Sequence, residues 1–445
     1  MISKHTPSNY RRSSNNRYLT LSPAQQKQFK SISGYEHDGY SLSGKFTTDR
    51  PEDADDWKYS PWQFSYAFFT ATGYLVCSLE HRMTNARQYG WDIDGNDLSH
   101  DFVSSFFPQE SPFKLNPFDH WFNQNTSHDE FLHWDRFIDK ATGSLLGLAL
   151  GDALGSTLEF KPKDSYEPIT GLIGGGIFHL QAGQWTDDTS MTLCLADSLI
   201  AERKQSSADQ LSRYVDWARY GLNSSTGQCF DVGNTVRTAL NHYLRTGDVL
   251  APTSAENCAG NGSLMRLAPI AIFYSPIKNV PLEITLEKAK QSSETTHTNP
   301  VAIEACQIMA WLLYRIFDGV ESKSALFEGL KDVFYSFSSE MTEIATGSFL
   351  RKSRDEVVGW GYVVKSLEAA LWCFAHSDSF EQGALLAANL GDDADTTAAI
   401  YGQLAGAFYG AEALPEHWLN KLFMAEHIES VAEQLAVGLV CDSDR

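Results

Sequence analysis

Apolar residues recur at helical spacing through most of the chain after residue 138. A spacing of three and four residues places such side chains on one face of an α-helix. The segment from Ile303 to Ile316 is apolar nearly all round, which is typical of a helix buried inside a large bundle. No alternation strong enough for a β-sheet occurs in this region. We therefore predict a mainly α fold, with clear helices at residues 189–203, 232–247, 299–319, 362–377 and 396–414.

Two of the helical segments carry a glycine at every fourth position. Glycine lowers helix stability, so a repeated glycine face usually marks a close contact with another helix. We interpret both rows as packing surfaces. Their members are Gly143, Gly147, Gly151 and Gly155 in one segment and Gly402, Gly406 and Gly410 in the other.

The composition of the chain changes near residue 137. Before this point the sequence is rich in polar residues, Pro and aromatics, with weak periodicity. We predict a flexible arm at residues 1–50, an aromatic-rich module at residues 51–136 and a helical domain at residues 137–445. Two interpretations of the module stay open. It is either a small α+β cap folded on the helical domain, or a partner-docking module, because clustered aromatics dominate protein interfaces.

Two acidic clusters about two hundred residues apart carry the candidate chemistry. Thr186, Asp187 and Asp188 stand in GQWTDDTS, and Asp393, Asp395 and Thr396 stand in GDDADTTAAI. Each cluster runs directly into a helical pattern. One cluster alone could be a helix N-cap. Two clusters of nearly identical chemistry favour a shared site, and oxygen donors without His or Cys suit Mg²⁺ or Mn²⁺ better than Zn²⁺.

Length and charge narrow the class of protein further. The chain has 445 residues, 42% of them hydrophobic, which is enough for a substantial core. Its formal net charge of -21 argues against nucleic acid or an anionic membrane surface as the main partner. The seven cysteines form no CxxC pair. We find no secretory signal and expect no segment long and apolar enough to span a bilayer, so we predict a soluble, cytoplasmic protein.

Seven strings in order resemble the ADP-ribosylglycohydrolase family, of the dinitrogenase-reductase-activating type. They are LGLALGDALGSTLEF, GQWTDDTS, DVGNT, GNGSLMRLAPI, TTHTNP, GYVVKSLEAAL and GDDADTTAAIYGQLAGA. The resemblance covers residues from about Phe137 to about residue 430. It implies a large all-α bundle with two Mg²⁺ or Mn²⁺ ions. It also implies hydrolysis of the bond that joins ADP-ribose to a protein side chain, often arginine.

The resemblance also assigns roles to individual residues. It implies metal ligands at Thr186, Asp187, Asp188, Asp393, Asp395 and Thr396. It implies catalytic roles for Glu159, Asp231 and Asp188. It implies substrate contacts at Gly233, Asn261, Gly262, Ser263, Met265, His297 and Tyr362, with the GNG loop around the phosphates and Tyr362 on the adenine. Asp392 replaces a glycine that is common in the family.

Each of these residues also has an ordinary structural interpretation when taken alone. Glu159 would be a solvated helix-end residue, and Asp231 would cap the helix that begins near Gly233. The GNG tripeptide would be a turn, His297 a satisfied polar residue and Tyr362 a core residue. The resemblance favours the functional interpretation for all of them.

Three functional hypotheses follow. The first is an ADP-ribosylarginine hydrolase that reverses the modification of a protein substrate. The second is the same scaffold acting on another ADP-ribosyl linkage, such as serine. The third is a binding protein that inhibits an ADP-ribosyltransferase through its N-terminal region. An immunity protein against an ADP-ribosylating toxin would combine the first and the third.

Overall fold

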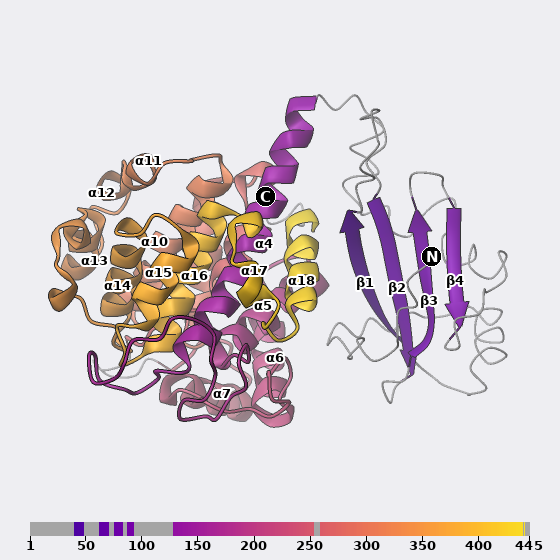
Figure 1. Cartoon of the computed structure of the whole chain (residues 1–445), viewed down its shortest axis with the longest axis horizontal. Coiled ribbons are helices and arrows are strands. Elements are labelled where there is room, and N and C mark those ends of the chain that lie inside the picture. Colours follow the sequence, from indigo (N-terminus) through magenta and orange to yellow (C-terminus); the bar gives the residue numbers. More distant parts are fainter. Residues whose placement is uncertain are drawn as a thin grey trace. The chain divides into compact units, whose positions relative to one another are not determined.

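The computed structural model describes residues 40–48, 62–70, 75–82, 87–92, 128–252, 259–438 and 440. The chain divides into two compact units, residues 1–120 and residues 121–445 (Figure 1). The rest of the predicted arm, outside residues 40–48, lies outside the described residues. The proposed division at residues 50 and 136 therefore stays a prediction.

The described part of the first unit is an antiparallel sheet with strand order β1-β2-β3-β4. Neighbouring strands pair in register, with Tyr40 opposite Thr70 and Gln63 opposite Arg82. The register shifts between Phe68 and Phe69, as at a β-bulge. The strand segments are rich in aromatic residues, which favour strands. The bounds are β1 (Tyr40–Thr48), β2 (Trp62–Thr70), β3 (Leu75–Arg82) and β4 (Arg87–Asp92).

The second unit is helical, which confirms the predicted all-α bundle. Helices lie at all five predicted segments. The α-helices are α4 (His128–Gly155), α5 (Asp187–Glu202), α6 (Ser207–Tyr220), α7 (Asn234–Thr246), α8 (Ala268–Phe273), α9 (Leu282–Glu294), α10 (Pro300–Phe317), α11 (Lys323–Phe327), α12 (Leu330–Val333), α13 (Ser339–Ala345), α14 (Val363–Ala375), α15 (Phe380–Ala388), α16 (Ala394–Tyr409), α17 (Glu416–Leu419) and α18 (Ala425–Val437). Short 3-10 turns lie at η2 (Pro276–Lys278), η3 (Ser348–Arg351), η4 (Arg354–Glu356) and η5 (Ala411–Ala413).

Helix α4 begins before the composition change that the sequence shows. It starts at His128, so the predicted boundary at residue 137 lies inside a continuous helix. Trp134 and Phe137 on its first turns are buried, and the ring of Phe137 packs edge-on against Phe317 of α10. Only three of residues 128–136 are apolar, which is why the sequence shows no clear helical periodicity there.

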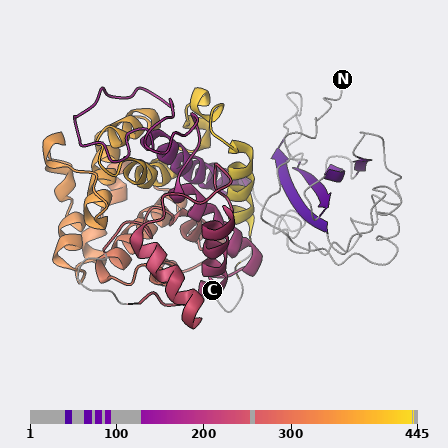
Figure 2. The same cartoon turned by 90° about the horizontal axis from the view of Figure 1, so that it is seen from below.

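Helix α4 runs through the helical unit, and α16 packs along it in the antiparallel direction (Figures 1 and 2). The two glycine rows face each other. A Cβ added at Gly143 would overlap the carbonyl oxygen of Gly406, and one added at Gly147 would overlap that of Gly402. At Gly151 it would overlap the carbonyl oxygen of Ala398. The glycines are therefore required for backbone contact, which confirms their interpretation as packing surfaces.

Helix α10 corrects one expectation from the sequence. Among the described residues it is long and apolar enough to cross a membrane by length and composition, although we expected no such segment. In the structure 61% of that window is buried inside the protein. Ile308, Met309 and Leu312 have no exposed surface. This burial is typical of the core helix of a bundle.

The contact between α4 and α16 generates a stability prediction. We expect Gly151→Ala to lower the free energy of unfolding by about 1–3 kcal/mol, because the methyl group must push two backbones apart. Gly233→Ala is the control, since a Cβ there meets nothing within 4 Å and its φ is -60°. The control should cost less than about 1 kcal/mol. Denaturant unfolding followed by circular dichroism measures both, and equal stabilities of the two variants would contradict the prediction.

Candidate metal centre and active site

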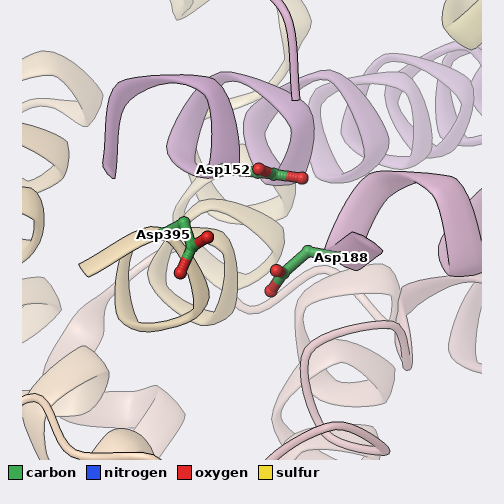
Figure 3. Close-up of side chains that lie close together, drawn as sticks. All are labelled: Asp152, Asp188 and Asp395. Carbon is green, nitrogen blue, oxygen red and sulfur yellow. The ribbon is translucent and has the colours of Figure 1, made fainter. Parts of the chain in front are cut away.

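Three carboxylates from three helices meet at one point in the helical unit (Figure 3). Asp152 lies near the end of α4, Asp188 on the first turn of α5 and Asp395 on the first turn of α16. Because α4 and α16 are antiparallel, the last turns of α4 lie beside the first turn of α16. One oxygen from each carboxylate lies within 4.8 Å of the others, and all three side chains are buried. The two acidic clusters of the sequence therefore converge.

Asp152 is a member of this site that sequence reasoning missed. Its Oδ1 accepts hydrogen bonds from the amide and the hydroxyl of Thr186, at 2.8 and 2.9 Å. Its Oδ2 accepts from the amide and hydroxyl of Thr189, at 2.9 and 2.6 Å. Four donors fix this carboxylate, which in turn fixes the start of α5. The only signal in the sequence was an Asp beside the glycine row of an apolar helix.

The capping alternative for the two clusters does not describe the structure. Thr186 is the N-cap of α5 and Asp393 is the N-cap of α16, and neither makes a side-chain cap hydrogen bond. Glu159 satisfies the start of α16 instead. Its Oε2 accepts from the amide of Ala394 at 2.9 Å and from that of Asp395 at 3.4 Å. Helix capping therefore does not explain why Thr186 and Asp393 stand at these positions.

Too few protons are available to satisfy the oxygens at the centre of the site. The single hydroxyl proton of Thr186 faces oxygens of Asp152, Asp188 and Asp395 at 2.9, 3.2 and 3.2 Å. Thr396 Oγ1 lies 3.4 Å from the same Asp188 oxygen, Oδ2. Asp188 Oδ1 is buried and has no hydrogen-bond partner. Buried polar atoms are normally satisfied, so this arrangement fits a bound cation.

The electrostatics agree with that conclusion. Burial raises the pKa of Asp187, of Asp188 and of Asp395 well above the usual value, and neighbouring carboxylates add to each shift. Burial raises the pKa of Glu159 as well, followed by repulsion from Asp395 and Asp393. Close carboxylates of this kind repel one another unless protons or a cation compensate them. The residues present therefore fit hard divalent cations.

Glu159, Asp393 and Asp395 form a second acidic group at the same site. Glu159 is 4% exposed, so it is not the solvated helix-end residue that an isolated glutamate would suggest. Asp393 Oδ2 accepts a hydrogen bond from the side-chain Nδ2 of Asn261 at 2.7 Å. This bond joins the GNG loop to the second acidic cluster, although 132 residues separate the two partners. Asn261, a predicted substrate contact, is therefore adjacent to Asp393, a predicted metal ligand.

The remaining residues of the GNG loop differ in their exposure. Ser263 and Met265 are each 3% exposed, and Ser263 Oγ accepts from the hydroxyl of Ser293 at 2.9 Å. The side chains of both residues therefore pack inward, which leaves backbone groups as their possible ligand contacts. Gly262 has no room for a side chain, because an added Cβ would lie 2.9 Å from Cε1 of His297.

His297 is 2% exposed and packs beneath this loop. Its Nδ1 lies 2.8 Å from the hydroxyl of Thr296. Burial, followed by the nearby guanidinium of Arg266, lowers the pKa of His297 to about 3. The imidazole is therefore neutral at physiological pH. Its position supports the shape of the loop, and its hydrogen bond satisfies one ring nitrogen.

Asp231 and Tyr362 are both only partly exposed. Asp231 has a φ of 55°, and Gly233, not Asp231, occupies the N-cap of α7. Burial, followed by repulsion from Asp393 and Asp152, raises the pKa of Asp231 to about 7. Tyr362 is not a core residue, and its hydroxyl donates to Glu340 at 2.7 Å.

Asp392, where the resemblance implies a glycine, has a backbone conformation that glycine adopts easily. Its φ is 57°, in the left-handed region that glycine adopts most easily. The amide of Asp392 donates to the carbonyl of Lys161, and its carbonyl accepts from the amide of Phe160, both at 2.7 Å. These bonds hold the loop before α16 against the segment that follows Glu159.

Comparisons with known proteins agree with the geometry. A family model described as ADP-ribosylglycohydrolase matches residues 133–443. The ADP-ribosylarginine hydrolase Tri1 of Pseudomonas putida is 42% identical over 68% of this chain and 79% of its own. The ADP-ribosyl-dinitrogen-reductase glycohydrolase of Rhodospirillum rubrum is 32% identical over 64% of this chain and 91% of its own. A solved structure titled ADP-ribosylglycohydrolase-related protein complex superposes with a TM-score of 0.60 at 39% identity, covering 68% of this chain and 98% of that one.

The raised carboxyl pKa values predict how stability depends on pH. A carboxyl whose pKa is raised on folding binds its proton more tightly in the folded state. That stabilisation is complete below the unfolded value and is lost as pH rises through the folded value, which is about 7 for Asp231. In chelator, the melting temperature should therefore fall between about pH 5 and about pH 8. Mg²⁺ should reverse much of the fall by binding the folded state.

Asp231→Asn should flatten this pH dependence, because it removes one of the titrating groups. The matched control is Asp332→Asn, at an exposed carboxylate of α12. Differential scanning fluorimetry across the pH range measures all three proteins. A melting temperature that rises with pH in chelator would contradict the predicted sign.

Proposed function

The chain belongs to the ADP-ribosylglycohydrolase family, and on that premise we propose that it hydrolyses ADP-ribose from arginine side chains of modified proteins with two Mg²⁺ or Mn²⁺ ions. The observation that carries the proposal is the buried convergence of Asp188 and Asp395 beside Asp152, with one Asp188 oxygen lacking any partner. The arginine linkage is supported by the 42% identity to a protein named for that activity. A serine linkage or another ADP-ribosyl compound is the alternative substrate.

The proposed metal ligands are the residues of the two clusters. They are Thr186, Asp187, Asp188, Asp393, Asp395 and Thr396. Asp152 would act as a positioning residue, because all four of its hydrogen bonds go to Thr186 and Thr189. Bound divalent cations would orient the ribose hydroxyls and a water molecule.

The proposed reaction breaks the bond between the anomeric carbon of the ribose and a guanidine nitrogen. Water supplies a hydroxyl group to the carbon, and the nitrogen leaves with a proton. Positive charge grows on the ribose, and the carboxylates of the site stabilise it. We assign the proton transfer to a carboxylate oxygen of Asp231, because that group is partly exposed and its pKa of about 7 suits exchange near neutral pH.

Glu159 has a different part in this proposal. Its Oε2 accepts from the first amides of α16 and so holds Asp395 in place. We therefore propose that Glu159 positions the sugar, close to the carbon at which the bond breaks.

The phosphate and adenine contacts are proposed from the loop and from Tyr362. Gly233, Asn261, Gly262 and Ser263 would offer backbone groups to the phosphates, as glycine-rich loops do for anions. Tyr362 pairs with Gly260 through an isolated β-bridge, so its backbone lies beside this loop. Met265 and His297 would support that region from beneath.

A second function is proposed for the first unit. Its sequence is dense in aromatic residues, and the family match begins only at residue 133. We propose that it binds a cognate ADP-ribosyltransferase toxin, so that the protein confers immunity both by inhibition and by hydrolysis. The seven cysteines without a CxxC pair support action in the cytoplasm. No nucleic acid or membrane partner is proposed, in keeping with the net charge of -21.

The central test is release of ADP-ribose from targets modified separately on arginine and on serine. We expect release from the arginine-linked target in Mg²⁺. Asp188→Ala and Asp395→Ala should each reduce it by about a hundredfold or more, since each removes a proposed ligand. Asp332→Ala is the control at an exposed carboxylate. Full activity in excess chelator would refute the metal requirement.

Tyr362 gives a prediction for substrate binding. Tyr362→Ala should weaken ADP-ribose binding by roughly 1–3 kcal/mol if its ring stacks on the base. Tyr362→Phe removes only the hydrogen bond to Glu340 and should keep most of the affinity. Isothermal titration calorimetry distinguishes the two variants. Equal losses in both would assign the effect to the Glu340 bond instead.

Two variants test toxin binding by the first unit separately from hydrolysis by the second unit. The full chain with Asp188→Ala should still bind and inhibit the transferase. A chain starting at Trp121, where the second unit begins, should hydrolyse but no longer bind it. If the first unit is only a stabilising cap, the shortened chain should aggregate or lose hydrolase activity. Full partner binding by the shortened chain would refute docking through the first unit.

A further inference from the structure

Three phenylalanine rings form a continuous row beside the candidate active site. The ring centroids of Phe160 and Phe178 are 6.4 Å apart, and those of Phe178 and Phe230 are 5.3 Å apart. We call Phe160, Phe178 and Phe230 the aromatic row. The first pair is edge-on and the second is tilted, arrangements that aromatic rings prefer.

The row connects the chain positions next to the two proposed catalytic acids. Phe160 directly follows Glu159, and Phe230 directly precedes Asp231. Phe178 bridges them from the loop between α4 and α5. That loop is anchored at the end of α4, since Thr157 Oγ1 donates to the carbonyl of Gly174 at 3.2 Å.

The rings of this row are not core residues. Phe160 is 60% exposed, while Phe178 and Phe230 are each partly exposed. Ile177, the neighbour of Phe178, is 56% exposed. These large apolar side chains are therefore in contact with water beside buried acids. An exposed apolar surface of this kind usually marks a binding site.

We propose that the aromatic row binds the arginine side chain from which ADP-ribose is cleaved, with the guanidinium against the rings and its aliphatic stem along them. This inference rests on the proposed hydrolase function and specifies its leaving group. A guanidinium is planar, delocalised and weakly hydrated, so it stacks well on aromatic faces. Asp231, which follows Phe230 in the chain and is partly exposed, would offer a carboxyl group to its positive charge.

The aromatic row would also make the enzyme prefer an arginine linkage to a serine linkage. A serine leaving group has neither a cation nor a long aliphatic stem, so it gains little from a row of rings. The row therefore acts on specificity for the leaving group and leaves the ADP-ribose part of the substrate untouched. That separation provides the test.

The test compares Phe178→Leu with Phe178→Tyr in the full chain. Leucine keeps an apolar side chain but removes the ring, whereas tyrosine keeps the ring. We expect Phe178→Leu to lower kcat/KM on an arginine-ADP-ribosylated protein by about 2- to 30-fold, the range for losing one cation–π contact. The kcat/KM of Phe178→Tyr should stay within about twofold of that of the wild-type enzyme. Tyr335→Leu, at a ring that is 76% exposed between α12 and α13, is the control.

Affinity for free ADP-ribose is the second readout, because this product lacks the leaving group. It should be unchanged in both Phe178 variants, whereas general damage to the site would lower it. Full kcat/KM in Phe178→Leu, or an equal loss in Phe178→Tyr, would overturn the inference while the hydrolase function stands. If the wild-type enzyme releases no ADP-ribose from arginine-linked targets, the proposed function itself fails.

Discussion

The direct contact between the backbones of α4 and α16 determines where Asp152, Asp395 and the start of α5 lie. Glycine at every fourth position removes the side chains that would otherwise hold the helices apart. Because the helices are antiparallel, their packing sets Asp152 near the end of α4 against Asp395 at the start of α16. Asp152 then fixes Thr186 and Thr189 at the start of α5 through four hydrogen bonds. A shift of one turn between α4 and α16 would separate the two acidic clusters.

The same packing imposes an electrostatic cost on the folded protein. Asp188 and Asp395 are at most 1% exposed, and burial followed by repulsion from neighbouring carboxylates raises the pKa of each. A stable core without a function would not concentrate unsatisfied carboxylates at the point where its central helices meet. The cost is local, however, because the apolar residues of α10 and α14 around the site are almost fully buried. The bundle therefore supplies the stability that the acidic centre lacks.

The sequence predicted the features that depend on local spacing. Helical periodicity located the five clearest helices, and the glycine rows indicated close packing. It missed Asp152, because a single acid in an apolar helix acquires its meaning only from a partner segment more than thirty residues away. It also missed Phe178, which meets Phe160 and Phe230 only after three separate loops fold together. It indicated no helix at residues 128–136, although α4 begins at His128.

Three non-glycine residues around the site adopt left-handed backbone conformations, and they suggest how the surrounding loops are used. Phe160, Asp231 and Asp392 have φ values of 59°, 55° and 57°. Each costs roughly 1–2 kcal/mol relative to glycine, which would adopt the same conformation without strain. Hydrogen bonds between Phe160, Lys161 and Asp392 compensate part of that cost. At Phe160 and Asp231 the retained side chains are a ring and an acid on the rim of the site. In the proposed function these two side chains contact the substrate, and glycine at either position would provide no side chain for that contact.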